Sequence, residues 1–177
     1  MASRGVAKRY AQAVFGLAEE TKSHDQWLAD LSRLANAIDD PTVGEFFKSP
    51  NVSLERKRAA IAALLPGDDH ALVRNVANMM ADRHRIDSAP LMYEVYRDLV
   101  LESRGIAVAN VTTAFELTPV EEQQIRVGLK NIVGRDVELR TAVDPNIIGG
   151  MVARIGDRLV DGSVVTQLNR LRQQIAR

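Results

Sequence analysis

The chain has 177 residues, of which 46% are hydrophobic and 26% are charged, with a formal net charge of zero. This composition is typical of a water-soluble protein with one or two domains, and a pI near 6.8 argues against a free-standing nucleic-acid binder, which usually carries a basic face. The absence of cysteine excludes disulfides and thiolate metal sites, and no apolar run approaches the ~20 residues that a membrane-spanning helix needs.

Helical periodicity fills residues 1–105. Apolar side chains recur at spacings of three and four residues, as on the buried face of an amphipathic helix. The first 18 residues also lack acidic side chains, as transit peptides do, but a first helix accounts for them equally well. Start and stop signals predict six helices, which suits an antiparallel bundle. These signals are Ser3, Asp25, Asp40-Pro41, Ser49-Pro50, Ser53, Pro66-Gly67, Asp69, Ala81, Ser88 and Gly105.

The pattern changes at Gly105. Residues 106–113 are rich in β-branched side chains, which predicts a strand. Thr118-Pro119-Val120-Glu121 is typical of a capping box with proline at the first helical position, so a helix should run to Val133. Residues 136–143 alternate as a second strand. The expected fold class is therefore α+β, with a six-helix bundle in residues 1–105 followed by a small α/β domain in residues 106–177.

Residues 143–175 should form a turn, a β-hairpin and a terminal helix. Asp144-Pro145 ends the preceding strand, because proline fixes φ and lacks a donor. Gly149-Gly150 frees the backbone to enter a strand, and Gly156-Asp157 fits a two-residue hairpin turn. Asp161-Gly162-Ser163 then provides loop and N-cap chemistry for a helix. Its apolar positions share one stripe that is expected in the core: Val164, Leu168, Leu171 and Ile175.

No residue pattern indicates catalysis. The histidines His24, His70 and His84 stand alone between helices and are expected to be solvated loop residues rather than metal ligands. Gly149-Gly150 leads into a strand, whereas glycine loops that hold phosphate lead into a helix N-terminus. Asp157 and Asp161 lie in turns, where aspartate is favoured for local hydrogen bonding. We therefore expect no catalytic residue, no cofactor and no metal ion.

The first helix carries a different kind of candidate site. Its small side chains, Ala7, Ala11, Ala13 and Ala18, leave shallow surface beside Tyr10 and Val14. Met79 and Met80 on the fifth helix are soft and adaptable. Together these residues fit a groove for a partner helix. Plain core packing is the alternative, and the residues alone leave both open.

Several short segments match one known family in order and spacing. The resemblance covers essentially the whole chain, and its most specific part lies between Asp144 and Ser163. The segments are Arg9-Tyr10-Ala11-Gln12-Ala13-Val14-Phe15, Phe46-Phe47-Lys48-Ser49-Pro50, Leu117-Thr118 with Glu121, Asp144-Pro145, Ile148-Gly149-Gly150, Ile155-Gly156-Asp157 and Asp161-Gly162-Ser163. With them the chain resembles the delta subunit of F-type ATP synthases, whose mitochondrial counterpart is the oligomycin sensitivity-conferring protein. One departure is Asp82-Arg83-His84-Arg85, where family members usually carry an Asn-Gly-Arg-like turn.

The resemblance implies a non-catalytic subunit of the peripheral stalk, which holds the catalytic head still while the rotor turns during proton-driven ATP synthesis. Residues 1–105 would bind the N-terminal helix of an alpha subunit, and residues 106–177 would contact the C-terminal ends of the b-type stalk subunits. The protein would then be peripheral to an energy-coupling membrane, on its cytoplasmic or equivalent side, with a bacterial plasma membrane as the expected host. The residues expected to line the alpha-binding groove are Tyr10, Ala11, Val14, Val76 and Met79.

Two other classes of function are weighed against this one. An RNA-binding or regulatory module is the first, since strand-helix-strand-strand-helix order also occurs in nucleic-acid readers. Stacking platforms need aromatic rings, however, and the only aromatic residue after Tyr96 is Phe115. A small-molecule enzyme is the second, and it would need a buried cluster of titratable groups in a pocket.

Overall fold

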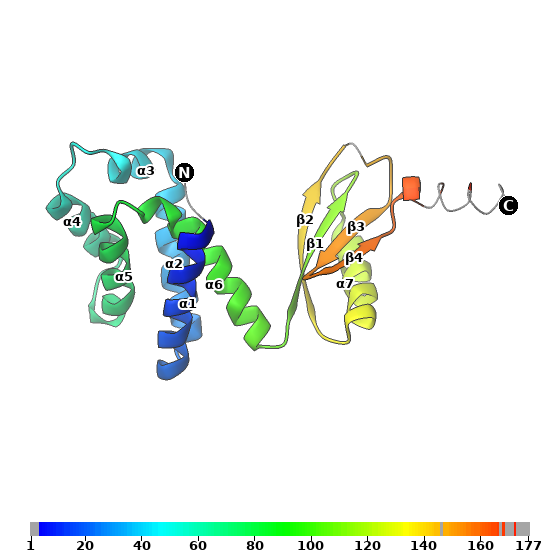
Figure 1. The fold of residues 1–177 in the computed structure, drawn as a ribbon, viewed down its shortest axis with the longest axis horizontal. Helices are drawn as coiled ribbons and strands as arrows, with labels where there is room; N and C mark the ends of the chain where they lie inside the picture. The colour runs from blue at the N-terminus through cyan, green and yellow to red at the C-terminus, as the bar shows by residue number, and fades with distance from the viewer. Residues whose placement is uncertain (1–3, 146, 167, 169–171, 173–177) are drawn as a thin grey trace. The chain divides into compact units, whose positions relative to one another are not determined.

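The computed structural model describes residues 4–145, 147–166, 168 and 172. The chain forms two compact units, Met1–Val100 and Leu101–Arg177. The architecture is mixed α+β, with helices in the first unit and a four-stranded sheet in the second (Figure 1). None of the helices in the described ranges combines the length and the apolar character that crossing a membrane would require.

The first unit consists of helices joined by short links. Its α-helices are α1 (Arg4–Thr21), α2 (His24–Asp39), α3 (Pro41–Lys48), α4 (Leu54–Leu64), α5 (Ala71–Asp82) and α6 (Ala89–Ser103), and its 3-10 turns are η1 (Asp68–His70) and η2 (Ile86–Ser88). Side chains cap α3 and α4, whereas α2 and α5 begin without a side-chain cap. The Asp40 carboxylate accepts from the amides of Thr42 and Val43, and the Ser53 hydroxyl accepts from the amide of Arg56. The proposed cap Ser3 lies outside the described residues.

The core of the first unit is built on α1, α2, α5 and α6. Large side chains from the last three fill it, among them Leu31, Leu34, Met80 and Tyr96. α1 contributes small ones: Ala7, Ala11 and Ala18 are fully buried. Because alanine has little side chain to accommodate, α1 can approach its neighbours closely. Three of the alanines expected to leave shallow surface therefore pack in the core, and only Ala13 is exposed.

Two of the three histidines are not solvated, contrary to expectation. His70 Nδ1 lies 2.7 Å from Oδ2 of Asp30, which is buried in α2. His24 lies with Nδ1 3.2 Å from the Tyr96 hydroxyl and Nε2 2.9 Å from Glu19. Only His84 is exposed in its turn. The sequence does not display these contacts, because Asp30 lies 40 positions from His70 and Tyr96 lies 72 positions from His24.

The second unit is a sheet with one helix packed on it. The strands are β1 (Ala107–Thr113), β2 (Val137–Val143), β3 (Met151–Ile155) and β4 (Arg158–Asp161), with α7 (Pro119–Val133) between β1 and β2. The sheet order is β2-β1-β3-β4, with β1 parallel to β2 and the other neighbours antiparallel. Ala109, Val111 and Ala153 form one buried face, against which Leu129 of α7 packs.

The turns of this unit have local causes. Thr118 and Glu121 form a full capping box, and Gly134 ends α7 in the left-handed conformation with φ +77°. The hairpin turns at Gly156-Asp157, with Ile155 opposite Arg158 and Gly156 at φ +56°. Local chemistry therefore fixes both the crossover helix and the hairpin.

The described part of the terminal stripe, Val164 and Leu168, is exposed, although the sequence predicts it in the core. Val164 is 37% exposed and Leu168 is 58% exposed, because α7 already covers the buried face of the sheet. Leu171 and Ile175 lie outside the described residues.

Candidate functional site

A surface pocket lies between α1 and α5, and we call it the α1–α5 pocket. It has a volume of about 410 Å³. Four of its seven lining residues are apolar or aromatic, and the other three are arginines. They are Val6, Arg9, Tyr10 and Ala13 of α1, Met79 of α5, and Arg83 and Arg85 of the following turn.

The residues expected to form a groove divide between this pocket and the core beneath it. Tyr10 and Met79 line the pocket. Ala11, Val14 and Val76 are 0%, 2% and 8% exposed, so their side chains belong to the core and support the pocket from behind. The helical period explains the division, because Tyr10 and Ala13 are three residues apart on one face, whereas Ala11 and Val14 lie on the adjacent one.

The turn after α5 brings two of the arginines to the pocket. His84 adopts φ +53°, and the amides of His84 and Arg85 donate to the carbonyls of Ala81 and Met80. This is a Schellman-type helix end, which reverses the chain immediately after the last turn. Arg83 and Arg85 are thereby held on either side of the left-handed residue. Sequence reasoning missed them because the arginine-rich turn also fits an ordinary solvated loop.

The arginines of the α1–α5 pocket form no ion pair with an acidic side chain among the described residues. The nearest carboxylate in sequence, Asp82, is engaged by Arg58 of α4, with a 2.7 Å contact between Nη2 and Oδ2. That hydrogen bond and charge raise the pKa of Arg58 above its ordinary value. Among the described residues, no ion pair joins Arg9, Arg83 or Arg85 to an acidic side chain.

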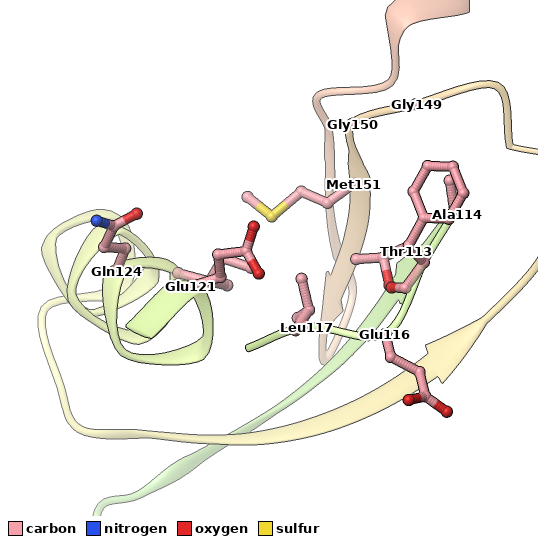
Figure 2. Close-up of a pocket in the computed structure, with 11 residues that line it drawn as sticks. Thr113, Ala114, Glu116, Leu117, Glu121, Gln124, Gly149, Gly150 and Met151 are labelled. Carbon is pink, nitrogen blue, oxygen red and sulfur yellow. The ribbon is translucent and has the colours of Figure 1, made fainter. Parts of the chain in front are cut away.

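A second pocket, of about 360 Å³, lies at one end of the sheet, and we call it the sheet-end pocket (Figure 2). Thr113 at the end of β1 pairs with both Val143 and Met151, so three strands meet there. Figure 2 shows Met151 reaching from β3 toward Glu121 and Gln124 of α7. The lining residues are Thr113, Ala114, Phe115, Glu116, Leu117, Glu121, Gln124, Ile125, Gly149, Gly150 and Met151.

The expected signature turns are distributed over both ends of β3. Gly149 and Gly150 line the sheet-end pocket, and Asp144-Pro145 follows β2 at the same end. Gly156-Asp157 forms the hairpin turn at the far end. Gly162 lies beside β3, where its amide donates to Met151.

Two independent features of the backbone require glycine at position 150. It has φ +81°, and a side-chain carbon there would overlap the Gly162 carbonyl oxygen and lie 3.1 Å from Ser163 Cα. Both the dihedral and the space exclude a larger residue.

The charge of the sheet-end pocket is acidic. Its lining includes Glu116 and Glu121 and no basic residue among those described. The Thr118 amide and hydroxyl donate to the Glu121 carboxylate and hold its pKa below the ordinary value, so this group is negatively charged at neutral pH. In the described part of the chain no three histidine, aspartate or glutamate side chains gather as metal ligands would. Both pockets offer apolar surface with charge of a single sign, which suits protein binding.

Comparison with known proteins gives one consistent result. The family described as ATP synthase delta (OSCP) subunit matches residues 6–175. The ATP synthase subunit delta of Dehalococcoides mccartyi is 37% identical over 171 residues, covering 97% of this chain and 94% of that protein. That of Oceanobacillus iheyensis is 34% identical over 177 residues, covering 99% and 97%. A chain in the cryo-EM structure of the Toxoplasma gondii mitochondrial ATP synthase hexamer has a similar fold, with a TM-score of 0.72, 22% identity and 97% coverage of both chains.

Proposed function

The chain belongs to the ATP synthase delta (OSCP) subunit family, and from this premise we propose how its two units hold their partners. A member of this family is a structural subunit in the peripheral stalk of F-type ATP synthase and has no catalytic role of its own. It serves proton-driven ATP synthesis by linking the catalytic head to the stalk. It is peripheral to the membrane, which it meets through the complex.

The helical unit, residues 1–105, acts as a six-helix bundle that binds the N-terminal helix of an alpha subunit in the α1–α5 pocket. The observation that carries this proposal is the pocket itself, which places Tyr10 and the 40% exposed Met79 side by side on the surface. Full burial of an exposed methionine side chain contributes about 1.5–3 kcal/mol, and covering the 40% of Met79 that is exposed contributes roughly half of that. Ala11, Val14 and Val76 contribute indirectly, because their packing fixes the positions of the two contact residues.

The α/β unit, residues 106–177, contacts the C-terminal ends of the b-type stalk subunits. A stator must hold two partners at once, since rotor torque loads both contacts. The presence of a surface pocket in each unit supports this division of labour. The matching delta subunits of bacteria support a place on the cytoplasmic side of a bacterial plasma membrane.

The test is a calorimetric titration of the full chain with a synthetic peptide of the alpha N-terminal helix. We expect saturable binding in the micromolar range or tighter, weakened about tenfold by Met79→Ala, a loss of about 1.4 kcal/mol. Leu17→Ala is the matched control, because Leu17 is on α1, is 42% exposed and does not line the pocket. Equal weakening by both variants would contradict the assignment of the pocket, and no binding at all would contradict the partner.

A further inference from the structure

We propose that Arg58 of α4 sets the charge of the α1–α5 pocket from outside the pocket, and thereby its choice of partner. Arg58 holds the Asp82 carboxylate on the α4 side of α5, so that the three arginines of the pocket stay available to an acidic group on the bound helix. This inference rests on the proposed function and deepens it, because it names a specificity-determining residue and the chemistry that the pocket selects.

The first observation is that Asp82 lies within reach of the pocket without lining it. Asp82 is the last residue of α5, and Met79 and Arg83 on either side of it in sequence both line the pocket. Residues three apart on a helix are neighbours on its surface, so a change of side-chain rotamer would turn the Asp82 carboxylate toward Met79. A carboxylate in that position would pair with Arg83 or Arg85 and neutralise part of the basic lining.

The second observation is the contact that keeps the Asp82 carboxylate away. Arg58 Nε donates to Asp82 Oδ1 at 3.3 Å, and Arg58 Nη2 donates to Oδ2 at 2.7 Å. A guanidinium that faces a carboxylate with two hydrogen bonds fixes its geometry as well as its charge. The two side chains are 53% and 37% exposed, so the effect of the pair should be moderate and sensitive to salt.

The third observation is that the pair is not needed to hold α4 against α5. Ile61 and Leu65, in and directly after α4, are fully buried in the core of the first unit. Arg74 of α5 adds two hydrogen bonds at this junction, from Nη1 to the carbonyls of Leu65 and Gly67 at 3.1 and 2.9 Å. The fold should therefore survive the loss of Arg58, and the charge of Arg58 remains as the property that matters.

The experiment is a calorimetric titration of the full chain with the alpha peptide at low salt. Arg58→Gln should weaken binding about threefold, because the released Asp82 carboxylate competes with the peptide for the pocket arginines. Arg56→Gln is the matched control, since Arg56 is exposed on the same helix, does not line the pocket and gives the same change in net charge. The difference between the two variants should shrink at high salt, where exposed charges are screened.

The variant Asp82→Asn separates a role in charge from a role in structure. It removes the carboxylate and keeps the size of the side chain, so binding should be at least as tight as in the parent chain. In the double variant Arg58→Gln/Asp82→Asn, the affinity should return to that of Asp82→Asn alone. A purely structural contact predicts a loss in both single variants and no rescue, and that result would overturn the inference. Equal affinities of Arg58→Gln and Arg56→Gln would also overturn it.

A second peptide separates this inference from the proposed function. This stalk peptide is a synthetic peptide of the C-terminal end of the b-type subunit, and its binding should be the same in every variant, because the substitutions lie in the other unit. Parallel losses of alpha and stalk binding in Arg58→Gln would indicate a general defect and refute the role of Arg58. A parent chain that binds the alpha peptide, with Arg58→Gln no weaker than its control, refutes only this inference. A parent chain that does not bind the alpha peptide refutes the proposed partner and the inference together.

Discussion

The two units present pockets of similar size with opposite charge. The α1–α5 pocket has three arginines and no carboxylate among its described lining residues, whereas the sheet-end pocket has two glutamates and no basic residue. The neutral total charge of the chain conceals this difference. We propose that a stator with two helical partners gains from this difference, because each pocket would repel the partner suited to the other. In this proposal, hydrophobic contacts supply the binding free energy in both pockets, and charge decides which partner binds in which pocket.

The largest expected effect is the destabilisation of one unit while the other remains folded. Gly150→Val should destabilise the α/β unit by about 2–4 kcal/mol, because both the positive φ and the nearby Gly162 carbonyl exclude a side chain. Differential scanning calorimetry should show loss of one unit's transition. In the assembled enzyme we expect uncoupled ATP synthesis with head hydrolysis intact.

The control for that variant is Gly128→Ala in the middle of α7, where an added carbon meets nothing within 4 Å. It should stabilise the helix by about 0.5–1 kcal/mol. If Gly150→Val also abolished binding of the alpha peptide, the units would not be independent.

A buried polar pair tests the helical unit. Asp30 is 1% exposed and lies 2.7 Å from His70 and 3.9 Å from Arg33. Asp30→Ala should cost about 1–3 kcal/mol, because it removes the partner of the half-buried His70. Chemical denaturation would measure this loss, and exposed Asp68→Ala should stay within about 0.5 kcal/mol of the parent. An equal loss in both variants would show that the pair contributes nothing specific.

Charge reversal sharpens the comparison directly. Arg83→Glu/Arg85→Glu should weaken alpha-peptide binding about tenfold and leave stalk-peptide binding unchanged. The control is Arg56→Glu, because Arg56 is exposed on α4. Arg33 is unsuitable as a control because its side chain contacts Asp30. Calorimetry at two salt concentrations would detect the change. An unaffected alpha affinity would mean that the arginines do not select the partner.

The smallest effect concerns the capping box. Thr118→Ala should destabilise the α/β unit by about 1 kcal/mol. Because the pKa of Glu121 is lowered in the folded state, its stabilising contribution is present above the pKa of the unfolded chain and disappears as pH falls through the lower folded value. The difference in melting temperature between parent and variant should therefore narrow below about pH 4, and the part that remains belongs to the hydrogen bond from the Glu121 amide to the Thr118 hydroxyl. A difference between parent and variant that grows as the pH falls would contradict the predicted sign of the pH dependence.

Much of the fold could be predicted because its signals are local. Ser53 and Thr118 cap their helices where the sequence indicates, α2 ends just before Asp40-Pro41, and Gly134 ends α7. The hairpin turn at Gly156 was predicted from the same kind of signal. Such features depend on a few adjacent residues, so tertiary context does not override them.

The rest depends on contacts that sequence does not display. Periodicity found the apolar face of α1 but did not separate its core stripe, with Ala11 and Val14, from its surface stripe, with Tyr10. His70 meets Asp30 from 40 positions away in the chain. The charge of the α1–α5 pocket arises where distant segments converge, as with Arg9 and Arg85. These are the features on which the proposed choice of partner depends.

The central claim is that one chain holds two helical partners at separate, charge-opposed pockets. The direct measurement is calorimetric titration of the alpha peptide into the full chain, alone and saturated with the b-type stalk peptide. The account predicts one alpha site in both cases with a dissociation constant unchanged within about twofold, since independent sites add. Competition between the two peptides, seen as a strong loss of alpha affinity at saturation, would contradict it.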